Sequence, residues 1–372
     1  MFQAKTETNR RPGRWARTDF DSSPMIVFYE LTRSCDLVCL HCRARAQPKP
    51  APGELTTEES MRLIDQLGRF PQPPTLVLTG GDPIKRPDIY DLIRHSVRTG
   101  LETAITPSPT PLLTREAIAR LRDAGISRMA VSVDGADADT HDRMRGVSGS
   151  FDQTRRIMED AQDLGIPLQV NTTLNPNNYD QIEEMAEQFA RRGIVLWSLF
   201  FIVPVGRATA DLRLSAEQYE AAFARLYAES LRRPFGIKTT EAMHYRRFVA
   251  QQRVEARKSG GAAPVPPPQF LTTGVNDGKG IMFVSHVGLI HPSGFLPMLC
   301  GVFPFNDVVE VYQRSPVFRR LRQPDALSGK CGVCEYRNLC GGSRARAYNV
   351  LGDPYASEPD CVYIPRAAAS AL

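Results

Sequence analysis

Three cysteines early in the chain have the spacing of a metal-binding loop. Cys35, Cys39 and Cys42 lie in the segment CDLVCLHC, shortly after the apolar run Ile26–Leu31. Three thiolates on a loop that leaves a strand can bind three irons of a cubane [4Fe–4S] cluster, so the fourth iron is open to a small molecule. Zinc or structural thiols are the alternatives, but His41 is too near Cys42 in sequence to complete a zinc site easily. A disulfide would leave one cysteine unpaired.

A second group of cysteines lies near the C-terminus. Cys331, Cys334 and Cys340 have C-x2-C-x5-C spacing, and Cys361 can return to them through a loop rich in Gly, Pro and Asp. Four thiolates can saturate one cubane cluster. A zinc ion with four cysteine ligands has the same ligand set and is the alternative. Cys300 stands apart without the companions that another cluster would need, so the sequence predicts one cluster here.

A glycine pair with an acid follows the apolar run Thr75–Thr79. Gly80 and Gly81 would let the backbone approach a ligand closely, and Asp82 could accept a hydrogen bond from an ammonium group. A tight turn without a ligand is the alternative. The motif is therefore a candidate binding site for an amine.

Two further runs end in polar residues that could bind a sugar. Ser132 and Asp134 are two residues apart, so on a strand they share one face and could bind ribose hydroxyls. Asn171 and Thr173 share a face of the next run and could bind a sugar or a carboxylate, although Asn171 could instead cap neighbouring backbone. A plain strand end with an Asp–Gly turn is the alternative for Asp134.

These residues are positioned by a regular alternation of apolar runs and amphipathic helical stretches. Nearly unbroken apolar runs are typical of strands buried on both faces, and each connection is long enough for a right-handed crossover. The sequence thus predicts a parallel α/β architecture, in which functional groups gather at the C-terminal ends of the strands; a doubly wound sheet is the alternative. The predicted strands are Ile26–Leu31, Thr75–Thr79, Glu102–Thr106, Arg128–Val133, Leu168–Leu174 and Val195–Val203.

The cysteine spacing, the TGGDP turn and the SVDG turn together resemble the radical S-adenosylmethionine (SAM) superfamily. The C-terminal cysteines resemble its branch with a SPASM or twitch domain, and the resemblance runs from about Val27 to Cys361. It implies a partial (β/α)6 TIM-type barrel with a small C-terminal iron–sulfur domain. It also implies that the open iron chelates SAM and that the reduced cluster cleaves it to a 5′-deoxyadenosyl radical, which abstracts hydrogen from the substrate.

The resemblance also implies roles for individual residues. The early cysteines would hold the SAM cluster and the later four an auxiliary [4Fe–4S] cluster. Ser343 and Arg344 stand where a two-cluster domain would have a further cysteine, which favours one auxiliary cluster. His41 occupies a position near adenine in the family. The implied SAM contacts are Gly80, Gly81, Asp82 (in place of the commoner Glu), Ser132, Asp134, Arg145 (toward the methionyl carboxylate) and Asn171.

Composition sets the remaining expectations. A net charge of +5 and a pI near 8.8 suit an anionic substrate but are too mild to indicate nucleic-acid binding. The sequence has no run of eighteen or more apolar residues, so it predicts no membrane span. The two separate cysteine groups suit metal sites in a reducing cytoplasm. The predicted divisions of the 372-residue chain are a flexible arm (1–22), a radical SAM barrel (23–206), bridging helices and a loop (207–280) and a SPASM/twitch-like domain (281–372).

The substrate class is open at this point. The Asp-Leu-x-Cys-x-His-Cys style and the Cys-Gly-Gly-x-Arg-Ala tail resemble haem-pathway members that decarboxylate or oxidise propionate chains of tetrapyrroles. A maturase of a ribosomally made peptide is the second hypothesis. A non-catalytic iron–sulfur protein for electron transfer or redox sensing is the third, but such a protein needs no SAM pocket. An enzyme of this kind would take its electron from a reductant such as flavodoxin or ferredoxin.

Overall fold

The structure is a computed structural model that describes residues 19–259 and 274–369. Most of the predicted N-terminal arm and the linker-like segment Gly260–Pro268 lie outside these residues. Within the described part of the chain, no helix has the length and apolar character needed to cross a lipid bilayer.

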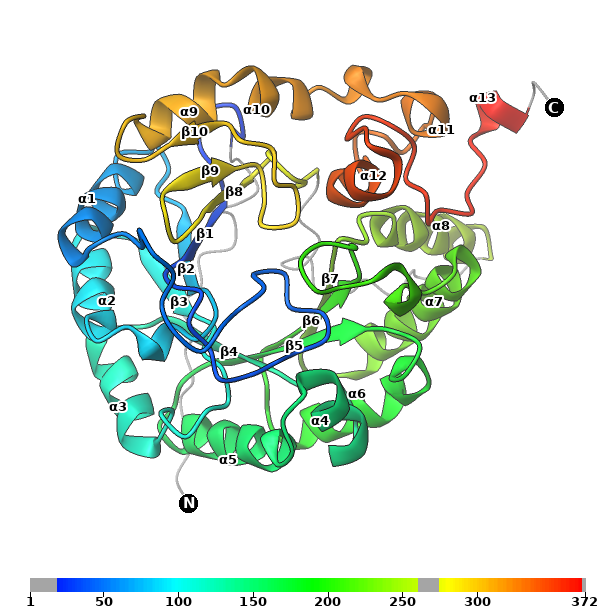
Figure 1. The fold of residues 1–372 in the computed structure, drawn as a ribbon. Helices are drawn as coiled ribbons and strands as arrows, with labels where there is room; N and C mark the ends of the chain where they lie inside the picture. The colour runs from blue at the N-terminus through cyan, green and yellow to red at the C-terminus, as the bar shows by residue number, and fades with distance from the viewer. Residues whose placement is uncertain (1–18, 260–273, 370–372) are drawn as a thin grey trace.

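A single curved sheet of ten strands organises the described residues, in the order β10-β9-β8-β1-β2-β3-β4-β5-β6-β7. Strands β8 and β1 to β7 are parallel to one another, whereas β9 pairs antiparallel with both β8 and β10. Figure 1 shows most of the helices in a ring outside this sheet. The arrangement confirms the predicted partial TIM-type barrel. The strands are β1 (Ile26–Glu30), β2 (Thr75–Thr79), β3 (Glu102–Ile105), β4 (Arg128–Ser132), β5 (Leu168–Leu174), β6 (Leu196–Phe201), β7 (Gly236–Thr240), β8 (Ile281–Val284), β9 (Leu289–His291) and β10 (Gly301–Val302).

The helices begin and end at residues suited to those positions. Thr56 and Glu59 form a capping box at the start of α1, and Gly125 ends α3 in the left-handed conformation at φ 102°. The helices are α1 (Thr57–Leu67), α2 (Ile89–Arg98), α3 (Arg115–Ala124), α4 (Ala138–Arg145), α5 (Ser150–Asp163), α6 (Ile182–Arg191), α7 (Ala216–Arg232), α8 (Tyr245–Lys258), α9 (Val308–Arg314), α10 (Pro316–Leu321), α11 (Gly329–Gly332), α12 (Arg344–Leu351) and α13 (Arg366–Ala369).

The main hydrophobic core lies between the sheet and the helix ring. Trp197 of β6 packs edge-on against Phe189 of α6 with ring centroids 5.2 Å apart, and Phe201 packs against Tyr219 of α7 at 4.7 Å. Because successive strand residues point to opposite faces, the residues between these point to the inner face of the barrel. Ser198 is one of them.

The six predicted strands are all present, but two parallel strands were not predicted. β7 lies in the part of the chain predicted as bridging helices and a loop, and β8 pairs with β1 as well as with its antiparallel partner β9. The sheet therefore continues through the predicted division at residue 281, and the proposed domain boundaries stay predictions.

Candidate functional site: two groups of cysteines

The first three cysteines lie together on the loop that leaves β1. Cys35 and Cys39 are buried with Leu37 and Ala46, and Cys42 packs against the same group. The Leu37 amide donates to Cys35 Sγ at 3.4 Å, and the Ala46 amide donates to Cys42 Sγ at 3.4 Å. Amide donors to sulfur stabilise thiolate, the form that binds iron. The loop thus has the donors that a cluster with one open iron needs.

A buried arginine faces Cys39, the second thiol of this group. Arg145, the last residue of α4, has Nη1 3.8 Å from Cys39 Sγ and Nη2 2.7 Å from Asp134 Oδ2. Burial raises the pKa of the Cys39 thiol, and the charge of Arg145 opposes that rise. Burial would also raise the pKa of Asp134, but Arg145 and His41 outweigh it and lower that pKa. The aspartate is therefore ionised and holds a cation beside the cysteine loop.

The glycine turn after β2 supports the start of the cysteine loop. A Cβ on Gly80, whose φ is 151°, would lie 2.5 Å from the Thr32 carbonyl oxygen, and one on Gly81 would lie 2.4 Å from that of Ser34. The Gly81 amide donates to Thr32 O at 2.7 Å. A side chain at either glycine would therefore push away the backbone that leads into Cys35.

Asp82 is buried behind this turn and organises the residue beside Cys35. Its carboxylate accepts hydrogen bonds from Thr110 Oγ1 at 2.8 Å and from the Ser108 amide at 3.3 Å. Ser108 Oγ in turn lies 3.5 Å from Cys35 Sγ. Burial raises the pKa of Asp82, although Thr110 and the amides oppose the rise. The structure places Asp82 next to the cysteine loop, and its contact with SAM stays a prediction.

The predicted sugar-binding residues lie on adjacent strands. Ser132 and Asn171 are register partners on β4 and β5. Asn171 Oδ1 accepts from Gln169 Nε2 at 2.7 Å, while the Thr173 amide donates to Asp134 Oδ1 at 2.6 Å. The structure thus brings Ser132, Asp134 and Asn171 together, and Asp134 pairs with Arg145. Their role toward ribose stays a prediction.

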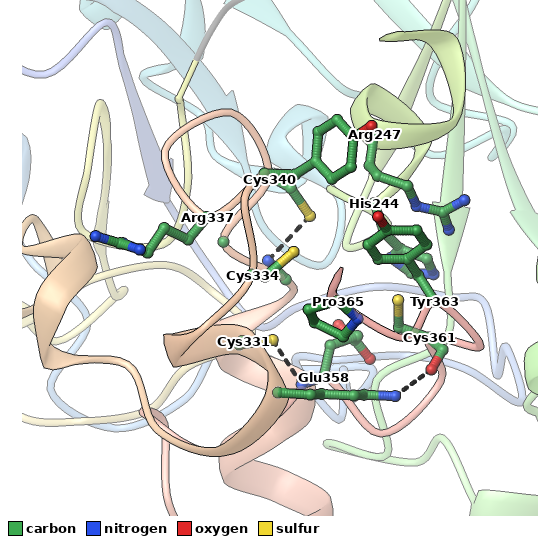
Figure 2. A pocket seen from close by; sticks show the side chains of 14 residues that line it. His244, Arg247, Cys331, Cys334, Arg337, Cys340, Glu358, Cys361, Tyr363 and Pro365 are labelled. Carbon is green, nitrogen blue, oxygen red and sulfur yellow. Dashed lines mark hydrogen bonds between the residues drawn. The ribbon is translucent and has the colours of Figure 1, made fainter. Parts of the chain in front are cut away.

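The four later cysteines surround one pocket (Figure 2). The Glu358 amide donates to Cys331 Sγ at 3.2 Å, and the Gly342 amide donates to Cys340 Sγ at 3.3 Å. Within the described residues, no three His, Cys, Asp or Glu side chains converge closely enough to hold a single metal ion. The four thiols line the pocket, and the thiolates of a cubane bind different irons, so such a cluster would take its ligands from around this space. The pocket lining includes Cys331, Cys334, Cys340 and Cys361.

His244 also lines this pocket and has an unsatisfied ring. It is 1% exposed and stacks on Tyr219 with centroids 5.2 Å apart. Burial, followed by the charges of Arg346 and Arg247, lowers the pKa of His244 well below its ordinary value. At least one of its ring nitrogens lacks a hydrogen-bond partner among the described residues. A buried polar atom without a partner is costly, so the ring is suited to a polar group bound in the pocket.

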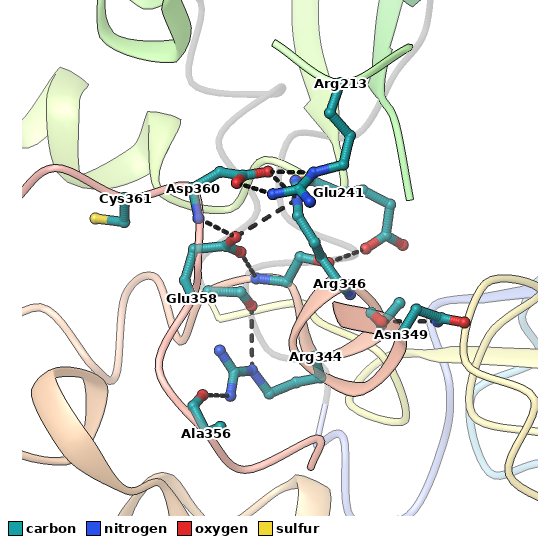
Figure 3. Close-up of polar contacts among 12 residues, drawn as sticks. Arg213, Glu241, Arg344, Arg346, Asn349, Ala356, Glu358, Asp360 and Cys361 are labelled. Atoms are coloured by element: carbon teal, nitrogen blue, oxygen red, sulfur yellow. Dashed lines mark hydrogen bonds and ion pairs between the residues drawn. The ribbon is translucent and has the colours of Figure 1, made fainter. Parts of the chain in front are cut away.

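A buried ionic network holds the last cysteine in place (Figure 3). Arg346 of α12 is fully buried, and its Nε lies 2.9 Å from Asp360 Oδ2. Arg213 from the barrel also pairs with Asp360, and Arg346 donates to the Glu241 carbonyl just after β7. Since Asp360 precedes Cys361, the network ties the four-cysteine pocket to the end of the barrel.

Ser343 and Arg344, where a two-cluster domain would have a cysteine, have structural roles. Ser343 Oγ accepts from the Arg346 amide at 2.9 Å at the start of α12. Arg344 Nη1 donates to the Pro354 and Ala356 carbonyls at 2.9 and 2.7 Å. Cys300 lies outside the pocket lining, where its thiol donates to Met298 O at 3.4 Å.

Comparisons with known proteins agree with this geometry. The sequence model of the Radical SAM superfamily matches residues 29–189. An "AdoMet-dependent heme synthase" of Nitratidesulfovibrio vulgaris is 39% identical over 94% of this chain and 96% of its own length. The chain belongs to the radical SAM superfamily. A "PqqA peptide cyclase" of Rhodopseudomonas palustris is 25% identical over 92% of this chain and 88% of its own. The solved structure of Streptococcus suis SuiB has a TM-score of 0.69 at 16% identity, covering 92% of this chain and 78% of that one, and supports the fold.

As a radical SAM enzyme, the protein uses a [4Fe–4S] cluster and SAM. The residues present fit these groups: three thiols with amide donors lie on one loop, and a fully buried carboxylate holds Arg145 beside it. The sequence indicates the thiols and offers His244 among several candidate substrate contacts, but it does not place His244 beside the four cysteines, and it gives no signal for Lys238 on β7. A histidine and a lysine in polar stretches carry no spacing signal, and only the fold brings them to an inner surface.

Proposed function

We propose that this enzyme oxidatively decarboxylates propionate side chains of an iron tetrapyrrole, with SAM bound at the cysteine loop. The observation that carries the proposal is the near full-length similarity to an AdoMet-dependent heme synthase, at 39% identity. The relative named as a peptide cyclase is only 25% identical in sequence. Within a superfamily, the chemistry depends on the residues of the site more than on the fold. The four-cysteine pocket would hold a second iron–sulfur cluster, which could accept an electron in this reaction.

Individual residues of the chain have separate roles in the proposed reaction. Cys35, Cys39 and Cys42 hold the cluster that reduces SAM, which is the source of the radical. Arg145 binds the methionyl carboxylate through its guanidinium, whose Nε has no partner among the described residues. Asp134 keeps that guanidinium in place with a 2.7 Å ion pair. A fixed cation binds a carboxylate with little reorganisation, because its own position is already determined.

The reaction balances in electrons and atoms. One SAM and one electron give methionine and a 5′-deoxyadenosyl radical, which removes a hydrogen atom from the propionate and becomes 5′-deoxyadenosine. The side chain then loses CO2 and one electron and becomes a vinyl group. The electron passes to a one-electron acceptor, and an iron–sulfur cluster in the four-cysteine pocket suits that role.

The test is anaerobic turnover of the reconstituted protein with SAM, dithionite and iron coproporphyrin III. Mass spectrometry should detect a porphyrin lighter by CO2 and two hydrogens for each side chain converted, together with 5′-deoxyadenosine. Cys35→Ala should form neither product. Cleavage of SAM with an unchanged porphyrin would reject this substrate class and favour the second hypothesis, a peptide maturase. That alternative has a specific observation behind it, since one solved relative in fold is SuiB bound to its precursor peptide SuiA.

A further inference from the structure

A row of four polar side chains crosses the inner face of the barrel. Ser132, Asn171, Ser198 and Lys238 are successive register partners on β4, β5, β6 and β7. Register partners in a parallel sheet point to the same face. Ser198 lies between Trp197 and Leu199, which are buried toward the helices, so this face is the inner one. The row therefore ends in a lysine inside the barrel.

Lys238 is a cation without a carboxylate. Its side chain is half-buried, and among residues 19–259 and 274–369 no hydrogen bond or ion pair involves its ammonium group. Burial, followed by the charge of Arg128, lowers the pKa of Lys238 to about 8. Two buried arginines of the described residues have carboxylate partners instead, Arg145 with Asp134 and Arg346 with Asp360. A charge taken from water without a partner is unfavourable, so this position favours an anion.

The opposite side of the barrel, formed by β2, β1, β8 and β9 (Figure 1), has mostly apolar and aromatic residues on its inner face. Val77, Phe28, Phe283 and His291 form a row across β2, β1, β8 and β9 in the same way. Arg43 stacks over the Phe283 ring at 4.6 Å, but its charge is already paired with Glu30 at 2.6 Å. An aromatic row facing a polar row with an unpaired ammonium suits a substrate that has a large apolar body and anionic side chains.

Two members of the row, Ser132 and Asn171, are themselves predicted SAM contacts, whereas Lys238 lies two strands farther along the sheet from Asn171. Asp134 and its partner Arg145 lie beyond the end of β4, whereas the row passes through Ser132, two residues earlier. Two residues of strand amount to roughly 7 Å. A ligand of the row would therefore lie deeper in the barrel than a carboxylate held by Arg145 at the cysteine loop.

We propose that the Lys238 ammonium binds a carboxylate of the substrate inside the barrel and orients the side chain that reacts. The inference rests on the proposed function, because it takes the substrate to be a tetrapyrrole with several carboxylates. Lys238 is a positioning and specificity residue that sets which carboxylate is held while another side chain faces the radical. The aromatic row then contacts the apolar ring system.

The test compares Lys238→Met with Lys238→Arg in the reconstituted, full-length protein. The probes are iron coproporphyrin III, which has four propionates, and its tetramethyl ester, which has the same iron and ring but no carboxylate charges. Losing a charge-assisted hydrogen bond should weaken binding of the tetra-acid about 10- to 100-fold in Lys238→Met. Lys238→Arg should retain most of the affinity, and the ester should bind both variants as it binds the wild type. Lys258→Met on the outer surface of α8 is the matched control.

The possible results separate the two proposals. Wild-type protein that neither binds nor converts the tetra-acid would overturn the proposed function and this role of Lys238 with it. Normal turnover by the wild type with equal tetra-acid affinity in Lys238→Met would overturn the Lys238 assignment alone. A loss of SAM affinity in place of porphyrin affinity would assign the lysine to the carboxylate of SAM and reject the substrate role. An equal loss for acid and ester would show that Lys238 only packs.

Discussion

The two cysteine sites are built in opposite ways. The first takes three thiols from one short loop, and the amides of Leu37 and Ala46 that face the sulfurs belong to the same loop. The second takes four thiols from a longer segment, which is held by the ion pair of Asp360 with Arg213 and by a hydrogen bond from Arg346 to the Glu241 carbonyl after β7. A local loop with three ligands is suited to leave an iron open to SAM, whereas a pocket closed by distant segments is suited to saturate a cluster.

The neighbouring charges differ as well. At the loop, Arg145 faces Cys39 and is held by the buried Asp134. At the pocket, Arg344 lies 4.0 Å from Cys331 Sγ, but its guanidinium also donates to the Pro354 and Ala356 carbonyls. We infer that Arg145 is positioned to bind a ligand, whereas Arg344 stabilises the fold of the loop around the pocket. Variants that separate the two sites test this comparison.

The largest expected effect comes from removing a thiol at each site. Cys35→Ala should abolish SAM cleavage, because the cluster loses one of only three protein ligands. Cys331→Ala should lose the second cluster, about four irons of about eight per chain, yet still cleave SAM when no porphyrin is present. Iron and sulfide analysis with chromatography of 5′-deoxyadenosine measures both. Zinc in the pocket of the wild type, or cleavage by Cys35→Ala, would contradict the comparison.

Arg346→Met should damage the second site while leaving the first intact. The substitution leaves the buried carboxylate of Glu358 without a cation and leaves Asp360 with Arg213 alone, and breaking a buried ion pair costs roughly 3–5 kcal/mol of stability. Denaturant unfolding of the apo-protein gives the free energy, and iron content after reconstitution gives cluster retention. Arg319→Met, at an exposed position of the outer helix α10, is a control for loss of charge. Loss of both clusters would show that Arg346 supports the whole barrel rather than the pocket.

Asp82→Ala should weaken SAM binding by roughly 1.5–3 kcal/mol, the range for a lost charged hydrogen bond. The absorption spectrum of both clusters should persist, because Asp82 is expected to contact the ligand and not iron. Equilibrium binding of SAM measures the effect, and Asp82→Asn keeps the shape of the side chain without its charge. An unchanged affinity in both variants would reduce the glycine–aspartate turn to its support of Thr32 and Ser34.

The smallest expected effect is that of Cys300→Ala. The thiol is partly buried against the main core and lies outside the four-cysteine pocket. Burial raises the pKa of this thiol to about 11, so it is protonated at neutral pH. Iron content and SAM cleavage should both equal those of the wild type. Loss of a whole cluster in this variant would require a second auxiliary site that includes Cys300.

The sequence was sufficient where chemistry depends on spacing or on apolar periodicity. The short cysteine intervals, the glycine turn and six buried strands each have a local signal, and each of those strands is present in the sheet. β7 was missed because Lys238, Thr239 and Thr240 are polar, which is typical of a strand with one side facing a polar interior rather than a helix layer. The place of His244 in the four-cysteine pocket and the contact of Arg346 with Glu241 could not be predicted, because each joins segments about a hundred residues apart.

The pairing of β1 with β8 has a consequence for the order of synthesis. Ile26 is the register partner of Ile281, so the strand that leads into the first three cysteines has one edge uncovered until β8 has been made. An unpaired strand edge can associate with other chains. We therefore expect nascent chains that stop before β8 to aggregate and to load iron poorly, although they already contain all three loop cysteines. Insertion of the SAM cluster would then follow completion of the polypeptide rather than accompany it.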